Sequence, residues 1–124
     1  MPSNDFQIIS VLLLNYFKGL HEADTQLLAN ITSEQLVLYS PDLRRSRDEW
    51  FAAITSRSVP LQLGDAFEYK VLSLDIVGSQ AMAKLACPLL GHNYIDFIGL
   101  LKEHGQWKII SKMYCDTDTD TNSK

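Results

Sequence analysis

Residues 94–114 read YIDFIGLLKEHGQWKIISKMY, two strand-length apolar segments joined by His104-Gly105. A turn this short joins antiparallel neighbours, because a parallel pair needs a crossover of about a dozen residues or more. The first segment also carries a carboxylate, Asp96, in its apolar middle. The stretch therefore predicts a β-hairpin with a candidate site residue inside one of its strands.

The hairpin belongs to a longer series of strand-like segments. These segments are 67–77, 80–90, 93–103 and 106–115. Turn-like pairs separate the earlier ones, namely Gly78-Ser79 and Gly91-His92. The second half of the chain is therefore predicted to form an antiparallel meander.

The first half of the chain has helical periodicity instead. Apolar residues recur at helical spacing from Phe6 to Leu20, which predicts a long first helix. Asp24 is suited to cap a short second helix that ends near Thr32. A short strand, residues 35–40, is predicted to follow.

A third helix is marked by its capping box. Ser46 and Glu49 have the S-x-x-E spacing, which predicts a helix over residues 47–57. Three arginines lie around its start, namely Arg44, Arg45 and Arg47. Guanidinium groups beside a helix N-terminus could hold an anionic group, and a solvated basic loop is the alternative.

Helices grouped ahead of an antiparallel sheet make an α+β domain in which the helices cover one face. With 124 residues and 46% hydrophobic content, the chain fits one domain, placed at residues 1–115. Residues 116–124 have no apolar residue and are predicted to form a disordered acidic tail. Asp116, Asp118 and Asp120 lack the glycine and glutamate of a calcium loop, so no metal is expected there.

Composition and segment lengths exclude several classes of protein. A net charge of −4 argues against nucleic acid as a partner. No apolar run is long enough to span a membrane, and residues 6–14 lack the basic flank of a secretory signal, so a cytoplasmic location is expected. Cys87 and Cys115 are too few for a disulfide framework and are expected to be small buried residues.

Both faces of the predicted sheet are apolar. In the third long strand, one face carries Tyr94, Asp96, Ile98 and Leu100, and the other carries Ile95, Phe97, Gly99 and Leu101. In the last strand, alternation predicts Trp107, Ile109 and Met113 on one face, with Ile110 and Tyr114 on the other. Because the helices can cover only one side, we predict a homodimer that packs through the second face.

Four segments resemble the nuclear-transport-factor-2-like superfamily, in the branch labelled putative lumazine-binding. They are YFKGLHEAD (16–24), DEWFAAITSRSVP (48–60), LDIVGSQAMAKL (74–85) and the hairpin stretch, and the resemblance covers about residues 7–114. It implies a cystatin-like cone, with N-terminal helices packed on a curved, mainly antiparallel sheet around a pocket. Members include ketosteroid isomerases, dehydratases and polyketide cyclases, commonly dimers through the sheet, and no cofactor is implied.

The isomerase-like pattern uses a tyrosine in the first helix, a base near the first strand and an acid deep in the sheet. The resemblance puts Tyr16 at the first position and Asp96 at the third. The first strand, QLVLYS, contains no carboxylate, so the expected base is missing. This departure weakens the case for isomerase chemistry.

Asp96 has two interpretations. In a pocket it is a candidate acid or hydrogen-bonding group, and at a sheet contact it pairs across the interface with Lys84, Lys102 or Lys112. Other catalytic candidates are His92, Tyr16 and Asp24, although Asp24 is more simply explained as a helix cap. The expected pocket wall comprises Tyr16, Tyr39, Trp50 and Phe67, with Asp96 as its polar group.

Three functions follow from these candidates. The first is a homodimeric domain that binds a small apolar or aromatic molecule between helices and sheet. The second is a cofactor-free isomerase, dehydratase or cyclase that uses acid and base residues of the pocket. The third is a protein-interaction module that docks a partner on its exposed sheet face.

Overall fold

The computed structural model describes residues 4–120 of the chain. Its helices are α1 (Asp5–Glu22), α2 (Thr25–Ile31), α3 (Arg47–Ser56), α4 (Pro60–Leu63) and α5 (Thr117–Asp120). Its strands are β1 (Thr32–Ser40), β2 (Leu43–Ser46), β3 (Lys70–Val77), β4 (Gln80–Leu89), β5 (His92–Glu103) and β6 (Gln106–Asp116). None of the helices in these residues is long and apolar enough to cross a membrane.

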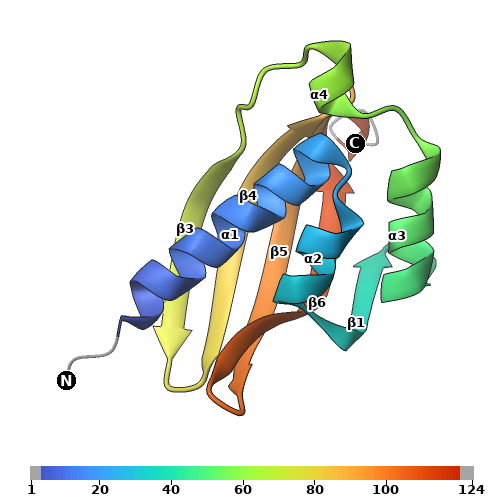
Figure 1. Ribbon diagram of the computed structural model, residues 1–124. Coiled ribbons are helices and arrows are strands. Elements are labelled where there is room, and N and C mark those ends of the chain that lie inside the picture. The colour runs from blue at the N-terminus through green and yellow to red at the C-terminus, as the bar shows by residue number, and fades with distance from the viewer. Residues whose placement is uncertain (1–3, 121–124) are drawn as a thin grey trace.

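All strands join one six-stranded sheet in the order β2-β1-β6-β5-β4-β3 (Figure 1). The meander β3 to β6 is antiparallel, as predicted, and β1 pairs with β6 in parallel. β2 was not predicted, because its four residues, LRRS, lack an apolar alternation. The sheet is therefore mainly antiparallel, and the α+β fold class is confirmed.

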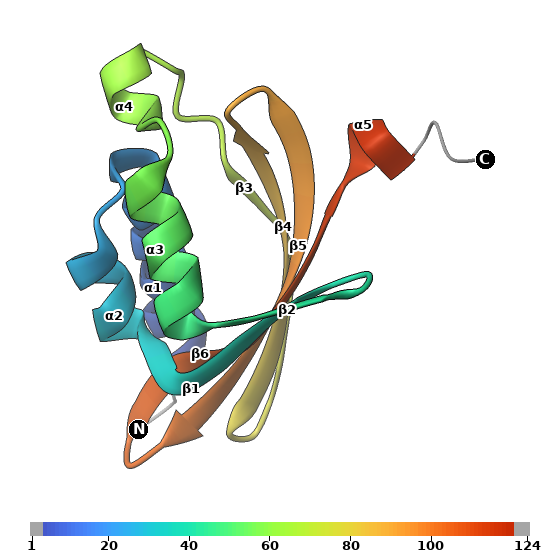
Figure 2. The same cartoon turned by 90° about the vertical axis from the view of Figure 1, so that its right-hand side faces the viewer.

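Helices α1 to α4 lie on one side of the curved sheet, and the short helix α5 lies on the other side, after the end of β6 (Figure 2). The hydrophobic core lies between helices α1 to α4 and the sheet. Its fully buried side chains include Ile9, Leu13 and Leu20 of α1 and Leu85, Ile98 and Leu100 of the sheet. We call the helix-covered side the inner face and the other side the outer face.

The two predicted helix caps are formed. Asp24 Oδ1 accepts a hydrogen bond of 3.0 Å from the backbone N–H of Leu27 at the start of α2. Ser46 and Glu49 make both hydrogen bonds of a capping box at the start of α3. These bonds satisfy backbone N–H groups that would otherwise have no partner in the first turn of each helix.

The inner face of β5 is as predicted, but the prediction for β6 was wrong. Leu100 pairs with Ile109 while Gly99 pairs with Ser111, so Ile110 is an extra residue in β6. A bulge of one residue moves every later side chain to the opposite face. The inner face of β6 therefore carries Trp107, Ile109, Lys112 and Tyr114, and Met113 lies on the outer face.

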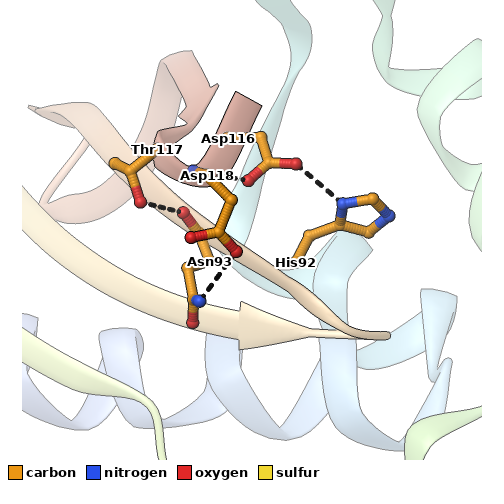
Figure 3. Close-up of polar contacts among 5 residues, drawn as sticks. All are labelled: His92, Asn93, Asp116, Thr117 and Asp118. Carbon is orange, nitrogen blue, oxygen red and sulfur yellow. Dashed lines mark hydrogen bonds and ion pairs between the residues drawn. The ribbon is translucent and has the colours of Figure 1, made fainter. Parts of the chain in front are cut away.

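The described structure continues past the predicted domain boundary at residue 115. β6 continues to Asp116, and residues 117–120 form α5. His92 Nδ1 lies 2.7 Å from Asp116 Oδ2, and Asn93 Nδ2 donates to Asp118 Oδ2 at 2.9 Å (Figure 3). Polar contacts thus join residues 116–118, which have no apolar side chain, to the start of β5. Residues 121–124 of the predicted tail lie outside the described residues.

Candidate functional site

A cavity of about 230 Å³ lies between the helices and the inner face of the sheet. Its walls come from α1, β1, β2, α3 with the residue after it, β4, β5 and β6. The lining residues are Leu20, Leu38, Arg45, Trp50, Arg57, Cys87, Leu89, Tyr94, Asp96, Lys112 and Tyr114. The wall is more strongly charged than the apolar pocket expected from the sequence.

Asp96 is the buried carboxylate of this wall, with 1% of its surface exposed. Its Oδ2 accepts hydrogen bonds from Tyr16 Oη at 2.7 Å and Cys87 Sγ at 3.4 Å. The same oxygen lies 3.8 Å from Lys112 Nζ. The other oxygen, Oδ1, is buried without a hydrogen-bond partner in residues 4–120. Asp96 thus lines the cavity and has one carboxylate oxygen without a partner among the described residues.

The donors to Asp96 hold their protons firmly. Burial, followed by the nearby Asp96 charge, raises the pKa of Tyr16 well above its usual value. The same two causes raise the pKa of Cys87. Tyr16 and Cys87 are therefore protonated donors at neutral pH, and they fix the orientation of the Asp96 carboxylate.

Lys112 is buried among aromatic rings. Its Nζ lies 4.7 Å from the ring centre of Trp50, 5.3 Å from that of Tyr16 and 5.4 Å from that of Tyr114. Burial lowers the pKa of Lys112, while the charge of Asp96 acts in the opposite direction. The rings and the carboxylate replace part of the hydration that the ammonium loses.

Two arginines add positive charge to the cavity wall. Arg57 follows α3, and burial lowers its pKa. Its Nη2 is buried and has no hydrogen-bond partner among the described residues. Together with Arg45 and Lys112, it gives the wall three cationic side chains against one carboxylate, Asp96. This excess favours an anionic group in the cavity.

The arginines near α3 have separate roles, which the sequence left open. Arg45 lines the cavity. The guanidinium carbon of Arg44 lies 4.9 Å from the ring centre of Tyr39, and Arg47 donates to the carbonyl of Thr32 at 3.3 Å. Arg45 alone of these three is therefore placed to contact a molecule in the cavity.

The structure brings together Tyr16, Trp50 and Asp96 of the predicted site. Trp50 and Asp96 line the cavity, and Tyr16 is fully buried against both of them. The alternative of Asp96 at a contact between chains is corrected, because Asp96 lies on the inner face and pairs with Lys112 of its own chain.

Two expected wall residues do not line the cavity. Tyr39 pairs with Met113, so it lies on the outer face. Phe67 is 45% exposed in the segment before β3, where its ring packs against His21 and Tyr69. Both were selected for their aromatic type, and residue type does not specify which side of a strand or loop faces the cavity.

Two expected catalytic residues also lie elsewhere. His92 pairs with Asp116 at the β4–β5 turn, and 53% of its side chain is exposed (Figure 3). Asp24 caps α2. Neither residue lines the cavity.

Sequence reasoning missed most of the polar wall. Arg57, Tyr94 and Tyr114 line the cavity without having been proposed for it, and Lys112 was considered only as a partner across an interface. Tyr94 could have been found from the shared face of β5 with Asp96. Lys112 and Tyr114 could not, because the bulge at Ile110 reverses the alternation that would place them.

The comparisons with known proteins concern nearly the whole chain. The family model described as "Putative lumazine-binding" matches residues 4–115. No protein of curated function matches the chain.

Several solved structures are similar to this one. A nuclear-transport-factor-2-like protein of unknown function from Silicibacter pomeroyi DSS-3 has a TM-score of 0.77 at 22% identity, covering 94% of this chain and 99% of that chain. A protein of the same description from Shewanella baltica OS155 has a TM-score of 0.77 at 25% identity, with coverages of 93% and 97%. A de novo designed protein with a curved β-sheet reaches 0.63 at 14% identity, covering 92% and 99%. The nuclear-transport-factor-2-like fold is thus confirmed, and function has to be argued from the cavity.

Proposed function

The chain belongs to the putative lumazine-binding family, and from this premise we propose that it binds a small, planar, anionic molecule in the cavity between helices and sheet. The observation that carries the proposal is a pair of buried polar atoms, Asp96 Oδ1 and Arg57 Nη2, that have no hydrogen-bond partner among the described residues. An unsatisfied buried polar group costs about 1–3 kcal/mol. A ligand with one donor and one anionic or carbonyl oxygen would satisfy both atoms.

The size and lining of the cavity narrow the ligand class. Pockets for drug-sized molecules have about 300–1,000 Å³, so a cavity of about 230 Å³ suits a smaller compound with one or two rings. Trp50, Tyr94 and Tyr114 offer aromatic surface for a planar ring. Lumazine, which the family description names, is a fused two-ring heterocycle with N–H and carbonyl groups and is one candidate.

Titration calorimetry tests this proposal with 4-hydroxybenzoate, which has both a donor and a carboxylate, with benzoate and 4-formylbenzoate, which have the carboxylate but no donor, and with lumazine. At least one compound should bind, and Arg57→Met should weaken it roughly tenfold or more, because a hydrogen bond to a charged group contributes about 1.5–3 kcal/mol. Arg44→Met is the matched control, since Arg44 lies over Tyr39 on the outer face and should leave binding unchanged. No binding by any compound, or equal binding by wild type and Arg57→Met, would contradict the proposal.

A homodimer through the outer face is the second part of the proposal. Met82, Phe97 and Met113 are 47%, 42% and 49% exposed on this face, and Phe97 pairs directly with Met113. Contiguous exposed apolar side chains of this kind favour a protein partner, and a second copy of the chain presents the same surface. We also propose a cytoplasmic location, because the Cys87 thiol must stay reduced to donate to Asp96 and the cytosol keeps thiols reduced. Cell fractionation can test this location.

A further inference from the structure

Lys112 is the buried lysine of the described chain. Of the lysines within residues 4–118, it alone is buried, with 8% of its surface exposed. The cavity needs no primary amine to attract an anionic ligand, because Arg45 and Arg57 already supply positive charge to the same wall. Unlike a guanidinium group, a lysine amine can lose its proton and act as a nucleophile.

The surroundings of Lys112 favour such reactivity. Charged and titratable groups face its amine from several elements, namely Tyr16 of α1, Arg45 of β2, Arg57 after α3, Cys87 of β4, Asp96 of β5 and Tyr114 of β6. Burial and the two arginines lower the pKa of Lys112, against the opposite effect of Asp96 and Cys87. The neutral amine is therefore more populated at neutral pH than in an exposed lysine.

We propose that Lys112 forms an imine with a carbonyl group of the bound ligand, so that the ligand is a small aldehyde or ketone that also carries a carboxylate. This inference rests on the proposed function, because the same cavity binds the ligand. Arg57 and Arg45 supply cationic groups for the carboxylate, and Lys112 supplies the amine for the carbonyl carbon.

The reaction balances without an external co-reactant. The neutral Nζ attacks the carbonyl carbon and forms a C–N bond, while the carbonyl π pair moves to oxygen. Asp96 Oδ2, 3.8 Å from Nζ, can transfer a proton from nitrogen to that oxygen and give the carbinolamine. The C=N bond then forms as the hydroxyl group leaves with the second N–H proton as water. Amine and carbonyl thus give imine and water, with no change of oxidation state.

Reductive trapping tests the inference in the full chain. The protein is incubated at neutral pH with 4-formylbenzoate and sodium cyanoborohydride, which reduces an imine to a stable secondary amine, and adducts are located by peptide mass spectrometry. Lys112 should be labelled at least roughly tenfold faster than any exposed lysine. Excess benzoate, which has the carboxylate but no aldehyde, should slow labelling at Lys112 and leave exposed lysines unaffected.

Two variants complete the experiment. Lys112→Arg keeps the buried positive charge but cannot form an imine, so it should lose the adduct. Lys84→Arg is the matched control, because Lys84 is exposed on the outer face opposite Phe97, and it should keep the adduct at Lys112.

The outcomes separate this inference from the proposed function. If calorimetry shows that 4-formylbenzoate binds and is weakened by Arg57→Met, yet Lys112 stays unlabelled or reacts no faster than exposed lysines, the imine is overturned and the binding function stands. If none of 4-hydroxybenzoate, benzoate, 4-formylbenzoate and lumazine binds, the proposed function fails and this inference fails with it.

Discussion

Asp96 and Lys112 form a buried ion pair whose members depend on each other. Each charge loses hydration in the inner wall, and the pair with its added hydrogen bonds from Tyr16 and Cys87 offsets part of that cost. The position of the pair at a cavity, and the unmet Oδ1 of Asp96, favour a role in binding over a role in stability alone.

Removing the carboxylate should therefore destabilise the protein strongly. Asp96→Asn leaves the Lys112 ammonium buried without its partner, and we expect a loss of roughly 3–5 kcal/mol in the free energy of unfolding, measured in urea. Asp75→Asn is the control, since Asp75 is exposed on β3, and it should change stability little. An Asp96→Asn variant as stable as the control would show that the pair contributes nothing.

Replacing Arg57 should weaken ligand binding without lowering the stability of the protein. Its buried Nη2 has no hydrogen-bond partner in the part of the chain that the structure describes, so Arg57→Met removes an unsatisfied group that costs about 1–3 kcal/mol. We expect the variant to unfold at an equal or higher temperature than wild type while losing ligand affinity. A clear fall in its melting temperature would indicate that Arg57 is a structural residue.

The buried phenols should make the fold sensitive to alkaline pH. Tyr16 has a folded-state pKa well above its ordinary value of 10.0, and burial raises that of Tyr69 to about 12. Above pH 10 the unfolded chain releases phenol protons that the folded chain retains, so stability present below that pH is lost as pH rises, by up to about 1.4 kcal/mol per unit and group. The lowered pKa of Lys112 has the opposite effect, because between that pKa and pH 10.5 the unfolded chain holds the proton more tightly and stability rises with pH.

Tyr16→Phe isolates the contribution of this one phenol. The variant lacks the hydrogen bond to Asp96 and should be less stable at neutral pH by about 1–3 kcal/mol. Its stability should then fall less steeply than that of wild type between about pH 10 and 11.5, measured by urea unfolding at each pH. Tyr39→Phe, on the outer face, serves as the control, and identical slopes for Tyr16→Phe and wild type would refute the argument.

At the scale of elements, α1 and α2 meet at Gly19. A Cβ placed on Gly19 would lie 2.5 Å from Cγ of Leu28, whose side chain is fully buried and cannot move aside. Alanine favours a helix over glycine by about 1 kcal/mol, but overpacking a core typically costs about 1–3 kcal/mol. The close approach of the two helices therefore requires glycine in α1.

We expect Gly19→Ala to lower the free energy of unfolding despite its better helix propensity. The net loss should be up to about 2 kcal/mol once the propensity gain of about 1 kcal/mol is subtracted from the overpacking cost, measured by chemical denaturation. Lys18→Ala, at the exposed neighbouring position of the same helix, should be neutral or slightly stabilising. A more stable Gly19→Ala variant would mean that α2 shifts easily and that the contact does not set the helix spacing.

At the scale of the whole molecule, helices α1 to α4 cover one face of the sheet, and the other face has the short helix α5 on its side (Figure 2). The inner face holds the core and the cavity, and the outer face presents Met82, Phe97 and Met113 to solvent. The proposed dimer would cover these residues without blocking the cavity, because the two lie on opposite sides of the sheet.

A charge on the outer face should therefore dissociate the dimer and leave ligand binding intact. Phe97→Lys should convert the protein to a monomer in light scattering after gel filtration, since a buried unpaired lysine is costly at an interface. Leu14→Lys is the matched control, because Leu14 is 48% exposed on α1, on the other side of the sheet. A wild-type protein that is monomeric at all concentrations would refute the homodimer.

The sequence by itself determined α1 to α3, β1, the meander β3 to β6 and their layering, but not the short elements β2, α4 and α5. The helical spacing from Phe6 to Leu20, the caps at Asp24 and Ser46 and the short turns between strands are local signals, and each produced the expected element. Such signals act between residues a few positions apart, so they can be read along the chain. The shared face of Tyr94 and Asp96 followed from the same local alternation.

Tertiary structure alone decided the composition of the cavity and the side of the sheet that several residues occupy. The bulge at Ile110 depends on how β6 pairs with β5, and it places Lys112 and Tyr114 inside while Met113 faces out. Arg57 reaches the cavity from beyond the end of α3, where no sequence pattern indicates a direction. Register and cavity lining arise from contacts between residues far apart in the chain, and for that reason the site could be located only after the chain was folded.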